Sequence, residues 1–445
     1  MASGDRHQSS QLLEKIKSRE AVVGIIGLGY VGLPLAIRCA DMGFPVLGFD
    51  IDEHKVKRLN SGQSYINHIG SDLIAKLVQQ ERLLATADFG RLGEADCILV
   101  CVPTPLTPYR EPDLSYIVNT MAAIKATLRP GQFISLESTT YPGTTSEVLL
   151  TQFEKTGLKA GKDFYLVFSP ERENPGNGKF ALAQIPKVVG GVTSECQRVG
   201  RTFYEQIVER VVLVASPEAA EMTKLLENIF RCVNIALVNE LKILCDRMGI
   251  DIWDVISAAS TKPFGFMPFY PGPGLGGHCI PVDPFYLTWK AREYDMVTRF
   301  VELAGEINSG MPQYVVAKTV EALNKRGRSI KDAKVLVLGV SYKKDVGDIR
   351  ESPALKVIEL LMRYEARVAY SDPHIPSFGN LRHYQLTMES LPLSESLLRE
   401  MDVVMIITDH GCFDYEQIVE CSQLIIDTRN ATSHVKAGRE KIIKA

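Results

Sequence analysis

Apolar residues along the first half of the chain alternate between short runs and longer stretches at helical spacing. The runs at 22–26 and 46–49 are typical of buried strands, and the segment 33–39 between them repeats apolar residues as a helix does. Further strand-like runs occur at 95–102, 131–138 and 163–169. Strands that alternate with helices in this way predict a mostly parallel, doubly wound α/β sheet.

A long helix is predicted in the middle of the chain. Ser216, Pro217 and Glu218 form a typical helix start, because serine caps the first turn, proline fits within it and the helix dipole favours an acid there. The apolar pattern then continues to about Met248, where Gly249 can end it. A helix of roughly thirty residues spans about 45 Å, which is long enough to cross between two domains.

A second series of strand-like runs follows at 333–343, 366–372, 402–408 and 424–430. We therefore expect a tail and short helix, an α/β domain, a helical middle domain and a second α/β domain. The expected bounds of these four parts are 1–20, 21–215, 216–325 and 326–445.

Composition and charge point to an ordinary globular protein. The chain has 445 residues, of which 45% are hydrophobic and 23% charged, and its formal net charge of −3 gives no electrostatic reason to expect nucleic acid or a membrane surface. No apolar run approaches the ~18 residues of a membrane-spanning helix. The nine cysteines are odd in number, lack a CxxC pair and mostly lie in apolar stretches, which favours reduced thiols in a cytoplasmic protein.

A glycine pattern at 27–32, GLGYVG, matches G-x-G-x-x-G. It follows a predicted strand and opens a predicted helix, and Asp50 lies at the end of the next strand. In this context the glycines allow a tight turn and close approach of a pyrophosphate at the helix N-terminus. Asp50 can bond a ribose 2′-hydroxyl and would repel a 2′-phosphate, so the pattern favours NAD over NADP. A glycine turn without a ligand is the alternative.

Cys279 stands alone in the glycine- and proline-rich stretch GPGLGGHCIPVDP at 272–284, which predicts a shaped loop. On the predicted long helix, Lys224, Asn228 and Arg231 share one face. Taken alone, that face is more typical of a solvated surface than of a site. The same holds for four other residues, each more typical of surface or structure when considered alone: Glu171, Lys343, Asp348 and Arg350.

Several motifs occur together and in order. They are GLGYVGLPLA, VPTP at 102–105, ESTTYPGTT at 137–145, SPE at 169–171, the Lys224/Asn228 helix, GGHCIPVD at 276–283 and the KxxxxDxRESP segment from Lys343. With these motifs the chain resembles the UDP-glucose/GDP-mannose 6-dehydrogenase family from about residue 22 to 430. The resemblance implies two Rossmann-like doubly wound domains joined by a long central helix and a helical middle domain. The first would bind NAD, the middle would dimerise and carry the nucleophile loop, and the last would bind the nucleotide-sugar.

The resemblance also implies a reaction, in which the C6 alcohol of a sugar is oxidised twice to a carboxylate with two NAD per substrate. Cys279 is then the nucleophile, which captures the aldehyde as a thiohemiacetal that becomes a thioester and is hydrolysed. Lys224 assists proton transfer and Asn228 shares in stabilising the oxyanion. Asp283 pairs with the catalytic water and the lysine.

Further roles follow from the same resemblance. Thr139 and Glu171 position or activate the water, and His278 shapes the pocket or the choice of substrate. The residues placed at the cofactor are Gly27, Gly29, Tyr30, Val31, Gly32, Asp50, Lys55, Thr104, Thr139 and Arg350. Those placed at the nucleotide-sugar are Glu171, Arg172, Lys224, Asn228, Arg231, Phe269, Tyr270, Gly276 and Lys343. No metal is expected.

Local departures from the family pattern point to a substrate. RENPGN after SPE, HCIPVDP around the cysteine and STKPFGFMPFYPGPG at 260–274 resemble the branch that oxidises UDP-N-acetylhexosamines. We expect a UDP-N-acetylglucosamine 6-dehydrogenase that makes a surface polysaccharide precursor, such as one for O-antigen, and that forms a homodimer or higher homo-oligomer. Alternatives are a UDP-N-acetylmannosamine or UDP-glucose dehydrogenase, a two-electron hydroxyacid-type dehydrogenase, and a non-catalytic nucleotide-sugar sensor.

Overall fold

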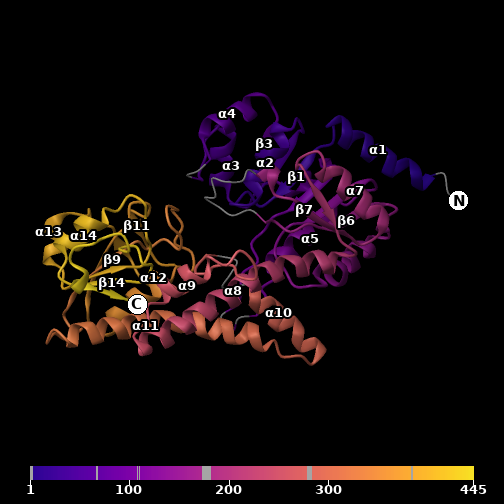
Figure 1. The fold of residues 1–445 in the computed structure, drawn as a ribbon. Helices are drawn as coiled ribbons and strands as arrows, with labels where there is room; N and C mark the ends of the chain where they lie inside the picture. The colour runs from indigo at the N-terminus through magenta and orange to yellow at the C-terminus, as the bar shows by residue number, and fades with distance from the viewer. Residues whose placement is uncertain are drawn as a thin grey trace. The chain divides into compact units, whose positions relative to one another are not determined.

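The computed structural model describes residues 4–66, 69–107, 109, 111–172, 182–277, 283–381 and 384–445. The chain divides into two compact units (Figure 1). The first unit comprises Met1–Glu227 and Phe285–Met296, and the second comprises Asn228–Pro284 and Val297–Ala445.

The first unit is built on an eight-stranded sheet in the order β3-β2-β1-β4-β5-β6-β7-β8. Its strands are β1 (Val23–Ile26), β2 (Val46–Phe49), β3 (Leu83–Thr86), β4 (Cys97–Val100), β5 (Gln132–Leu136), β6 (Phe164–Phe168), β7 (Lys187–Gly191) and β8 (Val211–Leu213). The first six are parallel in the order 3-2-1-4-5-6, which is that of a Rossmann fold. The predicted doubly wound sheet is confirmed here, and β7 departs from it by pairing antiparallel with β6.

Several helices lie wholly within the first unit, together with this sheet (Figure 1). They are α1 (Gly4–Ser18), α2 (Gly32–Asp41), α3 (Glu53–Asn60), α4 (Ser71–Gln79), α5 (Ser115–Thr127), α6 (Thr151–Phe153) and α7 (Ser194–Tyr204). Each of the strands β1, β2 and β4 has four residues, and all of these residues are buried, as expected for strands covered on both faces. At its N-terminus the chain forms a docked helix, because Leu12, Leu13 and Ile16 of α1 are buried in the same core.

The second unit contains a five-stranded, wholly parallel sheet in the order β10-β9-β13-β14-β15. Its strands are β9 (Lys334–Leu338), β10 (Arg367–Ser371), β13 (Val403–Ile406), β14 (Ile425–Asp427) and β15 (Ile442–Lys444), with a separate antiparallel pair β11 (Ser377–Phe378) and β12 (Met388–Glu389). Its helices are α9 (Ile252–Ala259), α11 (Arg299–Asn324), α12 (Pro353–Arg363), α13 (Glu395–Glu400) and α14 (Tyr415–Cys421). This order is that of the other common doubly wound sheet, so the second predicted α/β fold is also confirmed.

Two helices contribute residues to both units. They are α8 (Pro217–Met248), with 32 residues, and α10 (Asp283–Ala291). The predicted long helix is thus confirmed, and it ends as expected, because Gly249 has a φ of 71° and its neighbour's N–H bonds back to Cys245 O at 2.9 Å. Within the part of the chain that the structure describes, no helix has the length and apolar character needed to cross a membrane.

Candidate active site

The glycine loop between β1 and α2 has the form that a dinucleotide site requires. Gly27 has a φ of +91°, and a Cβ there would lie 2.6 Å from Cys101 O. A Cβ on Gly32 would lie 1.9 Å from Gly27 O, so this turn also needs the third glycine. At Gly29, by contrast, no atom of the described residues lies within 4 Å of the Cβ position, which leaves the backbone open to a ligand. The loop leaves β1 where the strand order reverses between β2 and β4, which is where open α/β sheets bind ligands.

Asp50 lies directly beside this loop, at the end of β2. The residue is 7% exposed, and its carboxylate accepts hydrogen bonds from Leu28 N and Asp52 N, each at 3.0 Å. Lys55 Nζ lies 3.4 Å from the same carboxylate. The acid and the lysine predicted at the cofactor are therefore brought together at the glycine loop, and the residues present fit the ribose and pyrophosphate of NAD.

Two threonines predicted at the cofactor follow the ends of β4 and β5. Thr104 is buried and Thr139 is partly exposed. The two loops that carry them are linked, because Ser138 Oγ donates a hydrogen bond to Val102 O at 2.8 Å. Both threonines therefore lie at the carboxyl edge of the sheet, on the same edge as the glycine loop.

Lys224 of α8 lies against the SPE segment. Its ammonium group is buried and donates a hydrogen bond to the backbone carbonyl of Glu171 at 2.6 Å. Arg172 pairs with Glu227 at 2.6 Å and donates to Pro186 O at 2.9 Å. The reading of this helix face as a solvated surface is therefore wrong for Lys224, and three predicted substrate residues lie together in the first unit.

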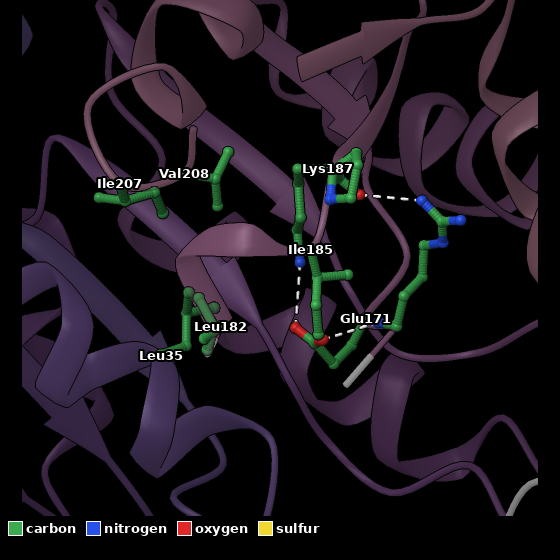
Figure 2. A pocket seen from close by; sticks show the side chains of 9 residues that line it. Leu35, Glu171, Leu182, Ile185, Lys187, Ile207 and Val208 are labelled. Carbon is green, nitrogen blue, oxygen red and sulfur yellow. Dashed lines mark hydrogen bonds and ion pairs between the residues drawn. The ribbon is translucent and has the colours of Figure 1, made fainter. Parts of the chain in front are cut away.

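The Glu171 side chain lies in a pocket that has one apolar wall (Figure 2). The apolar side chains there are those of Leu35, Leu182, Ile185, Ile207 and Val208. Lys187 Nζ lies 3.1 Å from Glu171 Oε2, and the same ammonium group pairs with the buried Glu137. Burial lowers the pKa of Lys187, but the charges of Glu137 and Glu171 outweigh it and hold the pKa above its usual value.

A second buried acid joins α8 to the ESTTYPGTT loop. Glu221, three residues before Lys224, is fully buried and accepts hydrogen bonds from Gly143 N at 2.6 Å and Thr145 N at 2.9 Å. Burial raises the pKa of this carboxyl group to about 7, although its hydrogen bonds to Thr145 and Gly143 act in the opposite direction. Glu221 thereby fixes the loop of Thr139 against the helix of Lys224.

In the second unit, Asn228 bonds to the acid that follows the predicted nucleophile segment. The Asn228 amide donates to the carboxylate of Asp283, and Arg231 donates to the Asn228 carbonyl oxygen. Asn228 is 0% exposed and Asp283 is 2% exposed, so the polar groups are removed from water together. The predicted nucleophile Cys279 and its neighbour His278 lie outside the described residues.

The glycine stretch that leads to Cys279 is anchored within the second unit. Gly272 N donates to Asn239 Oδ1 at 3.0 Å, and Gly277 N donates to Arg350 O at 3.1 Å. A Cβ on Gly276 would lie 2.7 Å from the Cβ of Tyr342, so glycine is required by this close approach. The predicted loop is thus shaped by its contacts as well as by its composition.

The remaining predicted residues lie in the second unit with different surroundings. Burial, with the nearby charge of Arg231, lowers the pKa of Lys343. Tyr270 stacks on Trp253 with ring centroids 5.5 Å apart, and Phe269 meets Phe230 at 5.6 Å. Arg350 forms a bidentate ion pair with Asp348, whose nearest contact is 2.6 Å, and its predicted place at the cofactor stays a prediction.

Comparison with known proteins agrees with this geometry. Residues 21–208 match the NAD binding domain of the UDP-glucose/GDP-mannose dehydrogenase family, residues 218–310 its central domain and residues 336–434 its UDP binding domain. A UDP-N-acetyl-D-glucosamine 6-dehydrogenase from Pseudomonas aeruginosa is 36% identical over 84% of this chain and 88% of its own. The chain belongs to the UDP-glucose/GDP-mannose dehydrogenase family.

Other members of the family are similar over nearly the whole chain. A UDP-N-acetyl-D-mannosamine dehydrogenase from Methanococcus maripaludis is 33% identical over 92% of this chain and 93% of its own. The solved structure of a UDP-D-ManNAc dehydrogenase from Pyrococcus horikoshii superposes with a TM-score of 0.83 at 32% identity, covering 94% of this chain and 96% of that one. As a member of this family, the protein is an NAD-dependent nucleotide-sugar dehydrogenase with three domains.

Sequence reasoning about this family member missed three buried charged residues: Glu137, Lys187 and Glu221. The first belongs to the quoted ESTTYPGTT motif and the last to the helix of Lys224, but neither stands out by spacing. A lysine at the start of the apolar run KVVGG was the available signal for Lys187, since an isolated cation in a buried strand needs a partner.

Proposed function

We propose that this dehydrogenase oxidises the C6 alcohol of UDP-N-acetylglucosamine to the uronic acid in two NAD-dependent steps, with Cys279 as the nucleophile. The observation that carries the proposal is the buried pair of Asn228 and Asp283, with Lys224 one turn earlier on α8. In the sequence, Asp283 follows the cysteine by four residues. A two-electron dehydrogenase needs no nucleophilic thiol.

The proposed reaction consists of two oxidations and one hydrolysis. Bound NAD supplies a hydride acceptor for each oxidation. In the first oxidation Lys224 assists removal of the hydroxyl proton as the C6 hydride leaves. The Cys279 thiolate then adds to the aldehyde carbon and forms a C–S bond, and the developing oxyanion is stabilised by Lys224 and Asn228.

A second loss of hydride and of the hydroxyl proton from this thiohemiacetal gives the thioester. Water then adds to the thioester carbon and the C–S bond breaks, which returns the thiolate and releases the carboxylate. Glu171 and Thr139 position the attacking water in this step, and Asp283 pairs with the water and with the lysine. Two NADH are formed for each sugar oxidised.

Charge in the second unit supports binding of a nucleotide diphosphate there. Arg231 and Lys343 come from different elements, and the charge of Arg231 contributes to the lowered pKa of Lys343. Two cations held near each other are a common solution for binding a diphosphate, whose charge offsets their repulsion. We assign these residues, with Phe269, Tyr270 and Gly276, to the nucleotide-sugar.

The choice of UDP-N-acetylglucosamine rests on the loop sequences around Glu171 and Cys279 and on the relative from Pseudomonas aeruginosa named for that sugar. The relatives from Methanococcus maripaludis and Pyrococcus horikoshii are named for the mannosamine epimer, which is therefore the alternative. We place the product in the synthesis of a surface polysaccharide such as O-antigen, in the cytoplasm.

We further propose a homodimer or higher homo-oligomer through the central part of the chain, at 216–325. Support comes from exposed apolar side chains of the second unit, which lie on α8, α9 and α11. They are Leu237, Leu244, Met248, Val255, Phe300 and Leu303. The parts proposed on either side are the N-terminal helix at 1–20, the NAD-binding domain at 21–215 and the nucleotide-sugar domain at 326–445.

A substrate screen with counted NADH tests the proposal. The purified protein is supplied with NAD and one of UDP-N-acetylglucosamine, UDP-N-acetylmannosamine or UDP-glucose, and both NADH and remaining sugar are measured. We expect the highest kcat/KM for UDP-N-acetylglucosamine and two NADH per sugar consumed, with turnover abolished by Cys279→Ala. Turnover of UDP-glucose alone would overturn the substrate, and one NADH per sugar would overturn the thioester route.

A further inference from the structure

The antiparallel strand β7 brings a lysine to the active edge of the first sheet. Phe168 of β6 lies opposite Gly190 of β7, and continuing this register three residues beyond β6 places Glu171 opposite Lys187. In a parallel strand the first residue would lie at the far edge of the sheet. Reversal of β7 therefore delivers its first residue to the carboxyl ends of β5 and β6, where Glu137 and Glu171 follow.

Lys187 is held between two carboxylates at this edge. Its ammonium group lies 3.1 Å from Glu171 Oε2 and also pairs with Glu137. On its other side, Glu137 accepts a hydrogen bond from the Tyr204 hydroxyl, whose oxygen lies 2.7 Å from Ser135 Oγ. The further contacts of Glu137 are thus with neutral hydroxyl groups. The side chains of Lys187, Glu137 and Glu171 are only 7%, 0% and 13% exposed.

Of these three residues, Glu171 is the one that contacts Lys224, the proposed catalytic lysine. Its Oε1 accepts a hydrogen bond from Arg172 N at 2.6 Å, and its backbone carbonyl accepts one from Lys224 at 2.6 Å. Figure 2 shows its carboxylate joined to Lys187 at the pocket. If Lys187 served only to neutralise Glu137, a second carboxylate beside it would not be needed. Buried ion pairs also stabilise a fold poorly compared with apolar packing, so stability alone does not explain this group.

We propose that Lys187 is a positioning residue for thioester hydrolysis, which holds the Glu171 carboxylate ionised and in one orientation. The inference rests on the proposed function, in which Glu171 positions the attacking water. Lys187 itself touches neither sugar nor cofactor in this assignment. An ionised Glu171 accepts a hydrogen bond from water, whereas a protonated one would offer a donor in the wrong direction.

Removing the cation has a definite consequence. Without Lys187 the nearly buried carboxylate of Glu171 loses the ammonium group that lies 3.1 Å from its Oε2, which shifts its equilibrium toward the protonated form. The acid limb of the hydrolysis rate should then move to higher pH. Removing Glu137 instead leaves Lys187 to Glu171 alone, and the acid limb should move to lower pH or stay in place.

The experiment separates hydrolysis from the two oxidations. Enzyme is mixed with excess NAD and UDP-N-acetylglucosamine, or with whichever UDP-sugar the screen shows to be turned over. NADH is followed through the initial burst, which reports thioester formation, and through the slower phase that hydrolysis limits. The variants are Lys187→Arg, the double variant Lys187→Met/Glu137→Gln, Glu137→Gln alone, and Glu171→Gln. The double variant removes one charge of each sign, which protects the fold, and thermal unfolding checks it.

We expect the double variant to keep its burst while hydrolysis falls about tenfold at pH 6 and the acid limb rises by roughly one pH unit. Lys187→Arg should keep hydrolysis within about threefold of the unmodified enzyme, because it keeps the cation. Glu137→Gln should show no rise in the acid limb, and this variant keeps a one-to-one ion pair even if the double variant fails to fold.

Three results would overturn the inference. The first is an unmoved acid limb in a folded double variant, and the second is a raised acid limb in Glu137→Gln. The third is an equal loss of burst and hydrolysis in every Lys187 variant, Lys187→Arg included, which is what a purely structural role predicts. The Glu171→Gln variant distinguishes failure of this inference from failure of the proposed function. If Glu171→Gln hydrolysed the thioester at the unmodified rate, Glu171 would have no part in the mechanism, and Lys187 would have no role through it.

Discussion

The carboxylate of Glu221 accepts hydrogen bonds from both the backbone N–H and the side-chain hydroxyl of Thr145, at 2.9 and 2.7 Å. This contact joins α8 to the loop that carries Thr139. Lys224 follows Glu221 by one helical turn, so one buried acid relates a proposed catalytic lysine to a proposed water-positioning threonine. How firmly Glu221 holds the loop against α8 depends on whether its carboxyl group is protonated.

Stability is therefore expected to depend on pH through Glu221. Its pKa in the folded protein is raised from 4.5 to about 7, mainly by burial. The stabilising contribution is complete below pH 4.5, is lost as the pH rises to about 7 and changes no further above that. The loss is on the order of 3 kcal/mol. Urea unfolding from pH 5 to 8 measures it.

The matched variants for this test lie on the same helix. Glu221→Gln should lose the component of the pH dependence between 5 and 7, whereas Glu240→Gln, which changes an exposed residue of α8, should keep it. Identical pH profiles for the unmodified protein and Glu221→Gln would show that Glu221 does not titrate in this range.

Cofactor choice is expected to depend on the charge of Asp50. Asp50→Asn keeps an acceptor for Leu28 N but removes the negative charge, so a 2′-phosphate is no longer repelled. The ratio of kcat/KM for NAD to that for NADP should fall at least about tenfold. Asp52→Asn is the control, because Asp52 caps α3 and asparagine caps equally well. An unchanged ratio in Asp50→Asn would remove Asp50 from cofactor selection.

Local features of the site were predictable from sequence, and long-range ones were not. The glycine loop, Asp50 and α8 follow from turn chemistry and apolar spacing, which act over a few residues. Helical spacing also placed Lys224 and Asn228 on one face, but could not say whether that face is covered. Burial of both depends on segments distant in sequence, such as Glu171 and Asp283.

Lys187 shows most clearly why part of the site could not be predicted. Its neighbours Glu137 and Glu171 lie 50 and 16 residues away in sequence. They meet only because β7 reverses direction beside β6, and no local pattern distinguishes an antiparallel strand in a chain that otherwise alternates strands and helices. The resemblance to a family supplied Glu171 but gave no reason to connect it with a lysine.

Asn228 is expected to act on catalysis through Asp283. Asn228→Ala removes a donor from a carboxylate that is 2% exposed, which should cost about 1–3 kcal/mol of stability and lower kcat more than it raises KM. Asn228→Asp places a second carboxylate beside the first, so activity should be lower still at pH 8 and partly recover toward pH 6 as the pair takes up a proton.

A control for both variants is Asn234→Ala, which removes an amide that donates a hydrogen bond to the Phe230 carbonyl on the same helix. Steady-state kinetics from pH 6 to 9 should leave Asn234→Ala close to the unmodified enzyme. If Asn228→Asp lost activity equally at every pH, repulsion between the two carboxylates would not be the cause.

Gly277, two residues before Cys279 in sequence, is expected to tolerate no side chain. Its φ is +82°, and a Cβ would lie 2.9 Å from the Tyr342 ring. Gly277→Ala should therefore lower kcat at least tenfold. This loss comes in addition to the roughly 1–2 kcal/mol by which an alanine with left-handed backbone angles destabilises the folded protein. Gly265→Ala measures that backbone cost alone, since Gly265 has a φ of +71° and, within the described part of the chain, its Cβ position has no atom within 4 Å. Adding Tyr342→Leu to Gly277→Ala should restore part of the lost rate by relieving the contact, and a double variant no better than Gly277→Ala would assign the loss to backbone strain.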